Sequence, residues 1–396
     1  MRVESICVKN FKAFRNVEFK EIPLFCVLVG ANGSGKSTLF DVFGFLKDCL
    51  VYNVKSAVQN RGGMKELASR GGENLVIEIT VQFRMTIAGV DRLVTYHLEV
   101  DEKDGKPAIR REILRYKRGR YGSPFHFLDF QHGQGYAISN EEDFNKPDEE
   151  LTREETTLDG PHILAIKGLG QFSRFKAAST FRQLIENWHM SDFHIDSARG
   201  SKLAAGYDEH LSPRGDNLQL VARNLYDNHR NVFLKIIEAM KRRVPGIEDV
   251  EPVPTMDGRL VLAFRDHPFA TAFVDRYVSD GTIKMFAYLV LLHDPAPHPL
   301  LCVEEPENQL YPSLLYELVE EFRQYAQLGG QVFVSTHSPD FLNGVQLGEV
   351  FWLAKKEGYT QAYRAQENEQ VRTYMEDGDQ MGFLWKQGFF EGADPK

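Results

Sequence analysis

Apolar and polar residues alternate over the first 30 positions, and this pattern predicts two or three strands. The last of them, residues 25–29, is apolar throughout and runs directly into Gly30. Apolar residues then recur every three or four positions over residues 37–50, which predicts a helix. A meander of strands should follow at residues 76–83, 93–100 (with a turn at 104–105) and 109–116. The polar, irregular stretch over residues 119–160 predicts loops.

The second half of the chain changes to helical spacing and then to short alternating elements. Helices are expected over residues 172–188 and 215–243, and a strand pair over 247–252 and 260–264. The remaining elements are expected in the order helix from 280, strand 300–303, helix from 312, strand 331–335 and helix from 338. Alternating strands and helices with short links predict an α/β fold with a parallel sheet covered by helices. We expect three segments: residues 1–160, a helical lobe over 161–250, and residues 251–396.

Composition narrows the class of protein. The chain has 396 residues and a net charge of −9, which argues against a general nucleic-acid coat. Charges interrupt the N-terminus where a signal peptide needs apolar residues, and the apolar runs are too short to span a membrane. The widely spaced cysteines form no Cys-x-x-Cys pair. Cys7, Cys26 and Cys302 lie in apolar strand-like runs and are expected to be buried, reduced thiols. We therefore expect a cytoplasmic protein that does not contact a membrane.

Residues 30–37 read Gly-Ala-Asn-Gly-Ser-Gly-Lys-Ser and match the phosphate-loop pattern G-x-x-x-x-G-K-[ST] between a strand and a helix. Glycines let backbone N–H groups turn toward a phosphate, and the helix N-terminus adds a positive dipole end. Lys36 is expected to neutralise the β- and γ-phosphates, and the Ser37 hydroxyl to bind Mg²⁺. The predicted nucleotide-binding residues of this loop are Gly30, Asn32, Gly33, Ser34, Gly35, Lys36, Ser37 and Thr38.

Residues 145–148, Asn-Lys-Pro-Asp, match the sequence with which GTPases read guanine. They lie in a polar stretch without a preceding apolar strand, and they precede the acidic strand described next. We interpret them as a solvated turn rather than a guanine site.

Two carboxylates follow the apolar strand at residues 300–303. We assign Glu304 to the Mg²⁺ shell and Glu305 to the activation of a water molecule, because a strand end beside a phosphate loop suits both roles. One strand later His337 follows residues 332–336, where a ring N–H could donate to a γ-phosphate. The catalytic candidates are thus Glu305, Glu304 and His337, and the metal candidates are Ser37 and Glu304.

Ser279 and Gly281 open the helix that precedes the acidic strand. A hydroxyl and free N–H groups at a helix N-terminus form a second, weaker anion site. An ordinary helix cap is the alternative interpretation. His189 and His194 flank Trp188 and Asp192 but lack a third ligand at a suitable spacing, so they predict no metal centre.

The order of these motifs resembles the ATP-binding-cassette (ABC) class of P-loop ATPases in its SMC/RecF-like branch. More closely, the chain resembles the bacterial AAA-labelled predicted ATPases without coiled-coil arms, which are related to the ATPase domains of the OLD family. The resemblance extends over almost the whole chain. The segments that carry it are residues 8–14, 30–37, 216–218, 276–281, 300–306, 307–312, 335–339 and 382–388. It implies an α/β fold in the form of an ABC/SMC-like ATPase head with a mixed β-sheet lobe and a helical lobe, and it implies ATP and Mg²⁺ as cofactors.

The resemblance further implies a homodimer or higher homo-oligomer that holds two ATP molecules between subunits. Ser279 and Gly281 of one subunit would cap the γ-phosphate held by the phosphate loop of the other. Two positions depart from the pattern of the branch: Glu304 stands where aspartate is usual, and Lys12 stands where an arginine is common. Lys12 is accordingly expected to touch the nucleotide with a point charge.

ATP hydrolysis in such heads times dimerisation, so the resemblance implies a molecular switch that acts on DNA or with a nuclease effector, in DNA repair or phage defence. The DNA-binding candidate is the basic stretch 110–120, for which a solvated strand is the alternative. Residues 351–396 are too few for the metal-dependent domain that nuclease relatives carry, so a nuclease would act in trans. The alternative function is a slow ATPase scaffold that sequesters or releases a toxin or other effector without contacting DNA.

Overall fold

The computed structural model describes residues 2–72, 75–87, 89–117, 124–140, 150–200, 202–203, 206–267, 269 and 271–393. Two compact units make up the chain: unit 1 is Met1–Trp188 with Gln346–Lys396, and unit 2 is His189–Val345. These units are divided differently from the three segments expected from the sequence, because the chain returns to unit 1 after Val345. The functional roles of the three expected segments remain a prediction.

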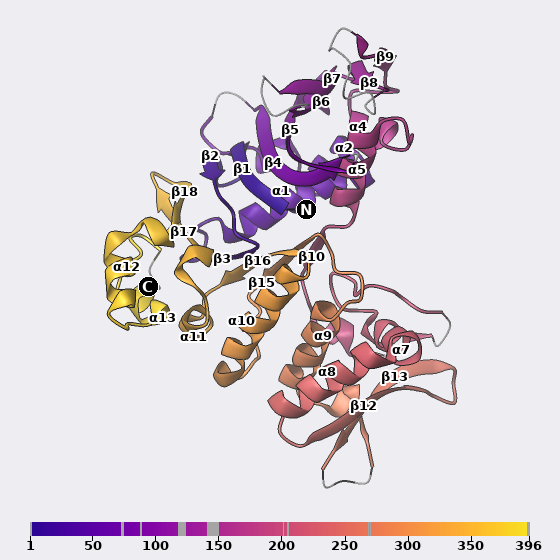
Figure 1. Cartoon of the computed structure of the whole chain (residues 1–396), viewed down its shortest axis with the longest axis vertical. Coiled ribbons are helices and arrows are strands. Elements are labelled where there is room, and N and C mark those ends of the chain that lie inside the picture. Colours follow the sequence, from indigo (N-terminus) through magenta and orange to yellow (C-terminus); the bar gives the residue numbers. More distant parts are fainter. Residues whose placement is uncertain are drawn as a thin grey trace. The chain divides into compact units, whose positions relative to one another are not determined.

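A long antiparallel sheet forms most of unit 1 (Figure 1). Its strands lie in the order β2-β1-β4-β5-β6-β7-β8-β9. Their bounds are β1 Arg2–Phe11, β2 Phe14–Phe19, β4 Ile77–Ile87, β5 Val90–Lys103, β6 Lys106–Tyr116, β7 Phe125–Gln131, β8 Gln134–Ile138 and β9 Arg153–Thr157. Asp104 and Gly105 have positive φ and form the predicted tight turn between β5 and β6.

The expectation of loops over residues 119–160 is wrong for the described part of that stretch. β7, β8 and β9 continue the sheet there, and His132-Gly133 forms the turn between β7 and β8 with positive φ at both residues. The β9 sequence, Arg-Glu-Glu-Thr-Thr, has no apolar face because the strand lies at the edge of the sheet. Its backbone hydrogen bonds to β8 therefore define the strand, and periodicity gives no sign of it.

Helices of unit 1 lie beside this sheet (Figure 1). Aromatic rings pack between the helices and the strands. Phe83 of β4 and Tyr96 of β5 both contact Phe181, with ring centroids 4.9 and 4.6 Å apart. Phe43 meets Trp188 edge to face at 5.4 Å. The helices are α1 Lys36–Val51, α2 Val54–Gln59, α3 Met64–Leu67, α4 Ala165–Leu169 and α5 Lys176–Glu186. The helix predicted to follow the glycine loop is thus confirmed as α1.

The second strand group of unit 1 joins the two ends of the chain. β3 (Phe25–Val29) is fully buried and pairs in parallel with β17 (Val350–Lys356), which pairs antiparallel with β18 (Tyr359–Arg364). Short helices complete the C-terminus; they are η3 Leu347–Glu349, η4 Ala365–Glu367, α12 Glu369–Glu376 and α13 Met381–Lys386. Trp385 and Phe390 are fully buried, so these tail aromatics pack within unit 1.

Parallel strands form the centre of unit 2, in the order β10-β15-β16. Their bounds are β10 His189–Ser191, β15 Leu300–Glu304 and β16 Gln331–Thr336. The helices beside them are α9 Asp280–Leu292, α10 Pro312–Gln327 and α11 Pro339–Asn343, as the sequence predicted. Every residue of α9 from Thr282 onward is buried, because the helix is enclosed by other elements of the unit.

The strand pair predicted over residues 247–252 and 260–264 is confirmed as β12 and β13, which belong to a larger sheet of unit 2. Its strands, which lie in the order β11-β13-β12 with β14 beside β13, are β11 Lys202–Leu203, β12 Ile247–Pro254, β13 Arg259–Asp266 and β14 Phe273–Val274. The remaining helices of unit 2 are α6 Ile195–Ala198, α7 Leu218–Asn228, α8 Arg230–Arg243 and η2 Asp275–Tyr277. Phe286 of α9 packs on Phe264 of β13 and Phe233 of α8, with centroids 5.8 and 6.5 Å apart. Helices and strands therefore pack together in this part of unit 2.

The cysteines match their prediction in part. Cys26, Cys49 and Cys302 are buried free thiols, whereas Cys7 is half-buried. Within the described ranges, no helix is both long enough and apolar enough to cross a membrane.

Glu112 of β6 is a buried carboxylate that fixes α4 to the sheet. Its oxygens accept the N–H groups of Ala165 (2.5 Å) and Ile166 (3.1 Å) at the start of α4, and the hydroxyl of Tyr96 (3.1 Å). Burial raises the pKa of Glu112 to about 7, although these hydrogen bonds act in the opposite direction.

We expect the free energy of unfolding to depend on pH through Glu112. The protonated carboxyl of Glu112 contributes fully to the free energy of unfolding below about pH 4.5, the ordinary pKa of a glutamate. This contribution is lost as the pH rises through about 7, the pKa of Glu112 in the folded protein. Glu112→Gln cannot ionise and should not lose this contribution. As the pH rises from about 4.5 to about 7, the free energy of unfolding of the wild type should therefore fall relative to that of Glu112→Gln by on the order of 3 kcal/mol. Denaturant unfolding at pH 5 and pH 8 measures the shift. Glu102→Gln, an exposed position on β5, is the control and should parallel the wild type; equal slopes for Glu112→Gln and wild type would contradict the prediction.

Candidate functional site

The phosphate loop of unit 1 lies between β3 and α1 and has the backbone that its glycines predict. Gly33 and Gly35 have φ of +73° and +109°, a region that side chains disfavour. Lys36 is 6% exposed, and its ammonium donates to the carbonyls of Gly30 (2.7 Å) and Ala31 (3.2 Å). A buried ammonium at the start of a 16-residue helix suits an anionic ligand. Asn32, Gly33 and Ser37 are exposed, Thr38 is half-exposed, and Ser34 is buried.

Strands from the other end of the chain lie against this loop. A Cβ at Gly30 would be 2.5 Å from the carbonyl oxygen of Leu353, and a Cβ at Gly35 would be 2.5 Å from the Thr360 hydroxyl. That hydroxyl donates to the carbonyl of Ser34 at 2.7 Å. The Lys355 ammonium is 3.8 Å from the Cβ position of Gly33. Thr360 and Lys355 are site residues that the sequence analysis missed, since neither belongs to a local motif.

Lys12 lies next to the first turns of α1 rather than within the loop. Its ammonium pairs with Asp41 at 2.6 Å, and the same carboxylate accepts the Arg61 guanidinium at 2.7 Å. Arg61 also pairs with Asp48 at 2.7 Å. Lys12 therefore has a carboxylate partner in unit 1, and its predicted nucleotide contact stays a prediction.

In unit 2, β15 and β16 run parallel and bring their carboxyl ends to one edge. Glu304 is exposed at the end of β15, opposite Ser335 of β16. Glu305 follows with φ of +44°, a strained value for a residue with a side chain. One of its carboxylate oxygens lies 3.3 Å from His337 Nε2, and the other accepts the Asn308 amide at 2.9 Å. The structure thus brings together Glu305 and His337, which the sequence proposed as catalytic residues.

A third carboxylate, Glu307, ties the two strand ends together. One oxygen accepts the Thr336 hydroxyl and the His337 N–H, both at 2.7 Å. Burial raises the pKa of Glu307, while these hydrogen bonds oppose the rise. Lys284 of α9 donates to the carbonyl of Asn308 at 2.8 Å, and burial lowers its pKa to about 8 against the attraction of Glu307 and Glu305. The sequence did not predict a role for Glu307 or Lys284, because no motif distinguishes these two residues from the residues beside them.

The Ser279 and Gly281 corner caps α9. The Ser279 hydroxyl accepts the Thr282 N–H at 3.3 Å, so the interpretation as a helix cap is confirmed, and the anion site stays a prediction. A Cβ at Gly281 would be 2.8 Å from the carbonyl oxygen of Gln309, so this position has no room for a side chain. Arg199 forms an ion pair with Asp280, the residue between Ser279 and Gly281. A pocket of about 570 Å³ opens beside the corner, lined among others by Ser279, Gly281, Thr282, Gln309 and Tyr311.

Two arginines at the start of the basic stretch are paired with carboxylates. Arg111 pairs with Asp129 at 3.1 Å, and Arg110 pairs with Glu99 at 3.4 Å. These pairs favour the interpretation as a solvated strand. Residues 118–120 of the stretch and the guanine-motif residues 145–148 lie outside the described residues.

The fold and the phosphate loop define a P-loop ATPase with the fold of an SMC head. A solved SMC head bound to the C-winged helix domain of ScpA superimposes with a TM-score of 0.51 at 14% identity, covering 92% of this chain and 98% of that one. The chain is also similar to the SMC head domain from Thermotoga maritima, with a TM-score of 0.44 at 14% identity, covering 92% of this chain and 99% of that one. A third similar structure is an Smc head domain with an extended coiled coil, bound to the C-terminal domain of ScpA and derived from Pyrococcus furiosus; its TM-score is 0.49 at 12% identity, covering 94% of this chain and 99% of that one.

The chain belongs to the family described as "AAA domain, putative AbiEii toxin, Type IV TA system", whose model matches residues 25–343. The predicted family and fold class are thereby confirmed. Among curated proteins, none matches the sequence.

Glu307→Ala should destabilise the protein by about 1–3 kcal/mol, because it leaves the His337 N–H and the Thr336 hydroxyl without their buried acceptor. Glu307→Gln keeps a carbonyl oxygen and should cost less. The control Glu238→Ala, at an exposed position of α8, should stay within about 0.5 kcal/mol of the wild type. Denaturant unfolding measures all three, and an unchanged stability in Glu307→Ala would refute the bracing role.

Proposed function

We propose that this chain binds ATP at residues 30–38 and hydrolyses it as a molecular switch. The observation that carries the proposal is the pair formed by Glu305 and His337 at the ends of neighbouring parallel strands. Together with a phosphate loop in unit 1, this pair supplies an acid-base group and a γ-phosphate sensor in one chain. Glu305 takes a proton from the attacking water, and His337 donates to the γ-phosphate.

The donor set fits the cofactors that the family implies. The buried Lys36 ammonium and the start of α1 suit phosphate oxygens, whereas the Ser37 hydroxyl and the Glu304 carboxylate are oxygen ligands suited to Mg²⁺. When bound, Mg²⁺ neutralises phosphate charge. Lys36 orients the triphosphate, and Glu307 keeps the His337 backbone in place.

We further propose that two copies pair on ATP, with Ser279 and Gly281 of one copy facing the γ-phosphate in the other. Support comes from the pocket beside this corner and from the absence of any side chain at Gly281. The corner offers a hydroxyl and the N-terminus of a 13-residue helix, which together suit an anion.

The switch is proposed to control an effector protein in trans, in a defence or repair context. The family description names a toxin of a type IV toxin–antitoxin system, and the similar SMC head is bound to a protein partner, ScpA. Direct DNA binding by β6 is the less favoured alternative, because Arg110 and Arg111 are already paired with carboxylates.

Glu305→Gln should slow ATP hydrolysis roughly 10²–10⁴-fold, the range for loss of a general base, while ATP binding is retained. Lys36→Ala should abolish nucleotide binding. Phosphate release and equilibrium binding of a fluorescent ATP analogue distinguish the two effects. If Glu305→Gln hydrolyses ATP at the wild-type rate, the assignment of the base is wrong.

Mixing two inactive variants tests the paired site. Lys36→Ala lacks phosphate binding, and Ser279→Arg blocks the corner with a side chain. A mixed dimer contains one intact loop facing one intact corner, so ATPase activity should reappear on mixing. Sedimentation with a non-hydrolysable ATP analogue should show dimers of the wild type and monomers of Ser279→Arg. Activity that stays absent in the mixture would exclude a site shared between subunits.

A further inference from the structure

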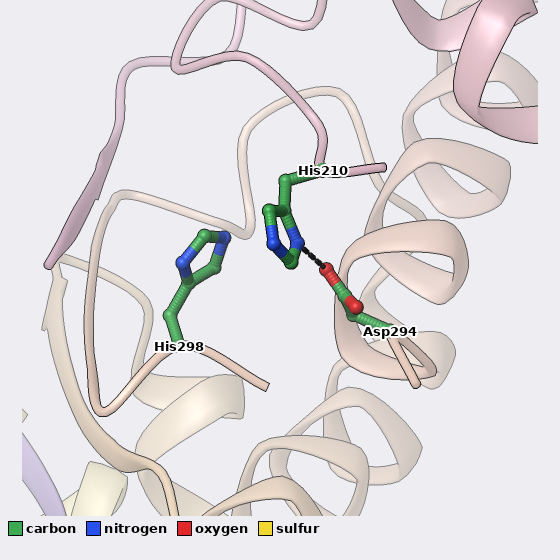
Figure 2. Close-up of side chains that lie close together, drawn as sticks. All are labelled: His210, Asp294 and His298. Carbon is green, nitrogen blue, oxygen red and sulfur yellow. Dashed lines mark hydrogen bonds and ion pairs between the residues drawn. The ribbon is translucent and has the colours of Figure 1, made fainter. Parts of the chain in front are cut away.

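Among the described residues, a group of three possible metal ligands gathers in unit 2, namely His210, Asp294 and His298 (Figure 2). One ligand atom from each residue lies within 4.8 Å of the others. His210 belongs to the segment between β11 and α7, whereas Asp294 and His298 belong to the link between α9 and β15. Figure 2 shows the His298 and His210 rings side by side, with the Asp294 carboxylate beyond His210. These residues take no part in the ATPase machinery proposed above.

The geometry is that of a compact nitrogen and oxygen donor set. His210 Nδ1 lies 2.6 Å from Asp294 Oδ2, and the ring centroids of His210 and His298 are 4.9 Å apart. A tetrahedral ion with ligands at about 2.0–2.2 Å needs donor atoms roughly 3.3–3.6 Å apart, so metal binding would widen the separation of 2.6 Å between His210 and Asp294. The Asp294 side chain is only 5% exposed, so its carboxylate lies largely out of water beside imidazoles.

Surrounding bonds hold the ligands in place. Asp294 Oδ1 accepts the Ala296 N–H at 2.9 Å, which directs the other oxygen toward His210. The backbone N–H of His298 donates to the buried Tyr325 hydroxyl at 2.7 Å, which holds the main chain that carries this ligand. Prolines at 295, 297 and 299 stiffen the link that carries two of the ligands. Such supporting contacts orient the ligands at metal sites.

The same three residues determine how water reaches the site and which metal ions suit it. Asp294, but neither of the two histidines of this group, lines a pocket of about 340 Å³ together with Lys235, Pro297 and Tyr325. Two imidazoles and one carboxylate suit Zn²⁺ and other divalent transition metals, whereas Mg²⁺ prefers oxygen ligands alone. His210 is 38% exposed, which leaves room for water in the fourth position.

We propose that His210, Asp294 and His298 bind a divalent transition-metal ion, with Zn²⁺ as the best match to the donor set. The ion joins the segment before α7 to the link after α9. Because α9 begins at the Ser279 and Gly281 corner, the bound ion anchors the far end of the helix that presents this corner.

Titration of the full-length protein with Co²⁺, without nucleotide, tests the proposal. Tetrahedral or five-coordinate Co²⁺ with nitrogen ligands gives visible absorption bands, and Zn²⁺ should displace it with one-to-one stoichiometry. His210→Asn and His298→Asn should each weaken Zn²⁺ binding by at least about 100-fold, the upper end of the range for losing a merely supporting partner. An excess of Mg²⁺ should leave the Co²⁺ bands in place.

His194→Asn is the matched control. His194 forms an exposed pair with Asp192 at 3.3 Å, similar in type to the pair of His210 and Asp294 but with no third ligand grouped with it among the described residues. This variant should bind Co²⁺ and Zn²⁺ as the wild type does. Circular dichroism verifies that each variant is folded. If His298→Asn unfolds, the test rests on His210→Asn, which changes a partly exposed side chain. Absent bands in the wild type, equal affinity in His210→Asn, or equal loss in His194→Asn would each overturn the proposal.

Discussion

The organisation of unit 1 depends on the close approach of β17 and β18 to the phosphate loop. β17 and β18 lie so near the loop that Gly30 and Gly35 have no space for a Cβ, and the Thr360 hydroxyl bonds to the loop carbonyl of Ser34. The loop is therefore shaped by its own glycines and by strands that follow it by more than 300 residues. This explains why the first 188 residues and the last 51 form one compact unit.

Unit 2 is organised around α9 in a comparable way. Ser279 caps its N-terminus and Gly281 lies in its first turn, where the carbonyl oxygen of Gln309 would be 2.8 Å from a Cβ at Gly281. Lys284, one turn later, bonds to the segment that holds Glu305 and Glu307. The last turn leads into the proposed metal ligands. A single helix, buried along its length, thus connects the corner, the carboxylates and the His–Asp cluster within one unit.

Prediction from the sequence succeeded for the most strongly apolar elements and failed for β7, β8 and β9, although β7 and β8 each have buried residues. Residues 25–29 and 280–292 are strongly apolar, and their strand and helix were predicted correctly. β9 is polar on both faces and was predicted as loop, because an edge strand exposes side chains and is held by backbone bonds to one neighbour. The sheet β11–β14 was likewise only half predicted, since β11 and β14 have two residues each.

The amino-acid sequence by itself determined the phosphate loop, the acidic strand end and the histidine that follows the next strand, since each is a local pattern of residue types beside a strongly apolar strand. Only the tertiary structure decided which side chains meet: Thr360 with the loop, Glu307 with the His337 backbone, and His210 with Asp294. Periodicity reports the environment of one segment, whereas contacts between distant segments depend on how strands pair and helices pack, and local spacing does not encode that pairing.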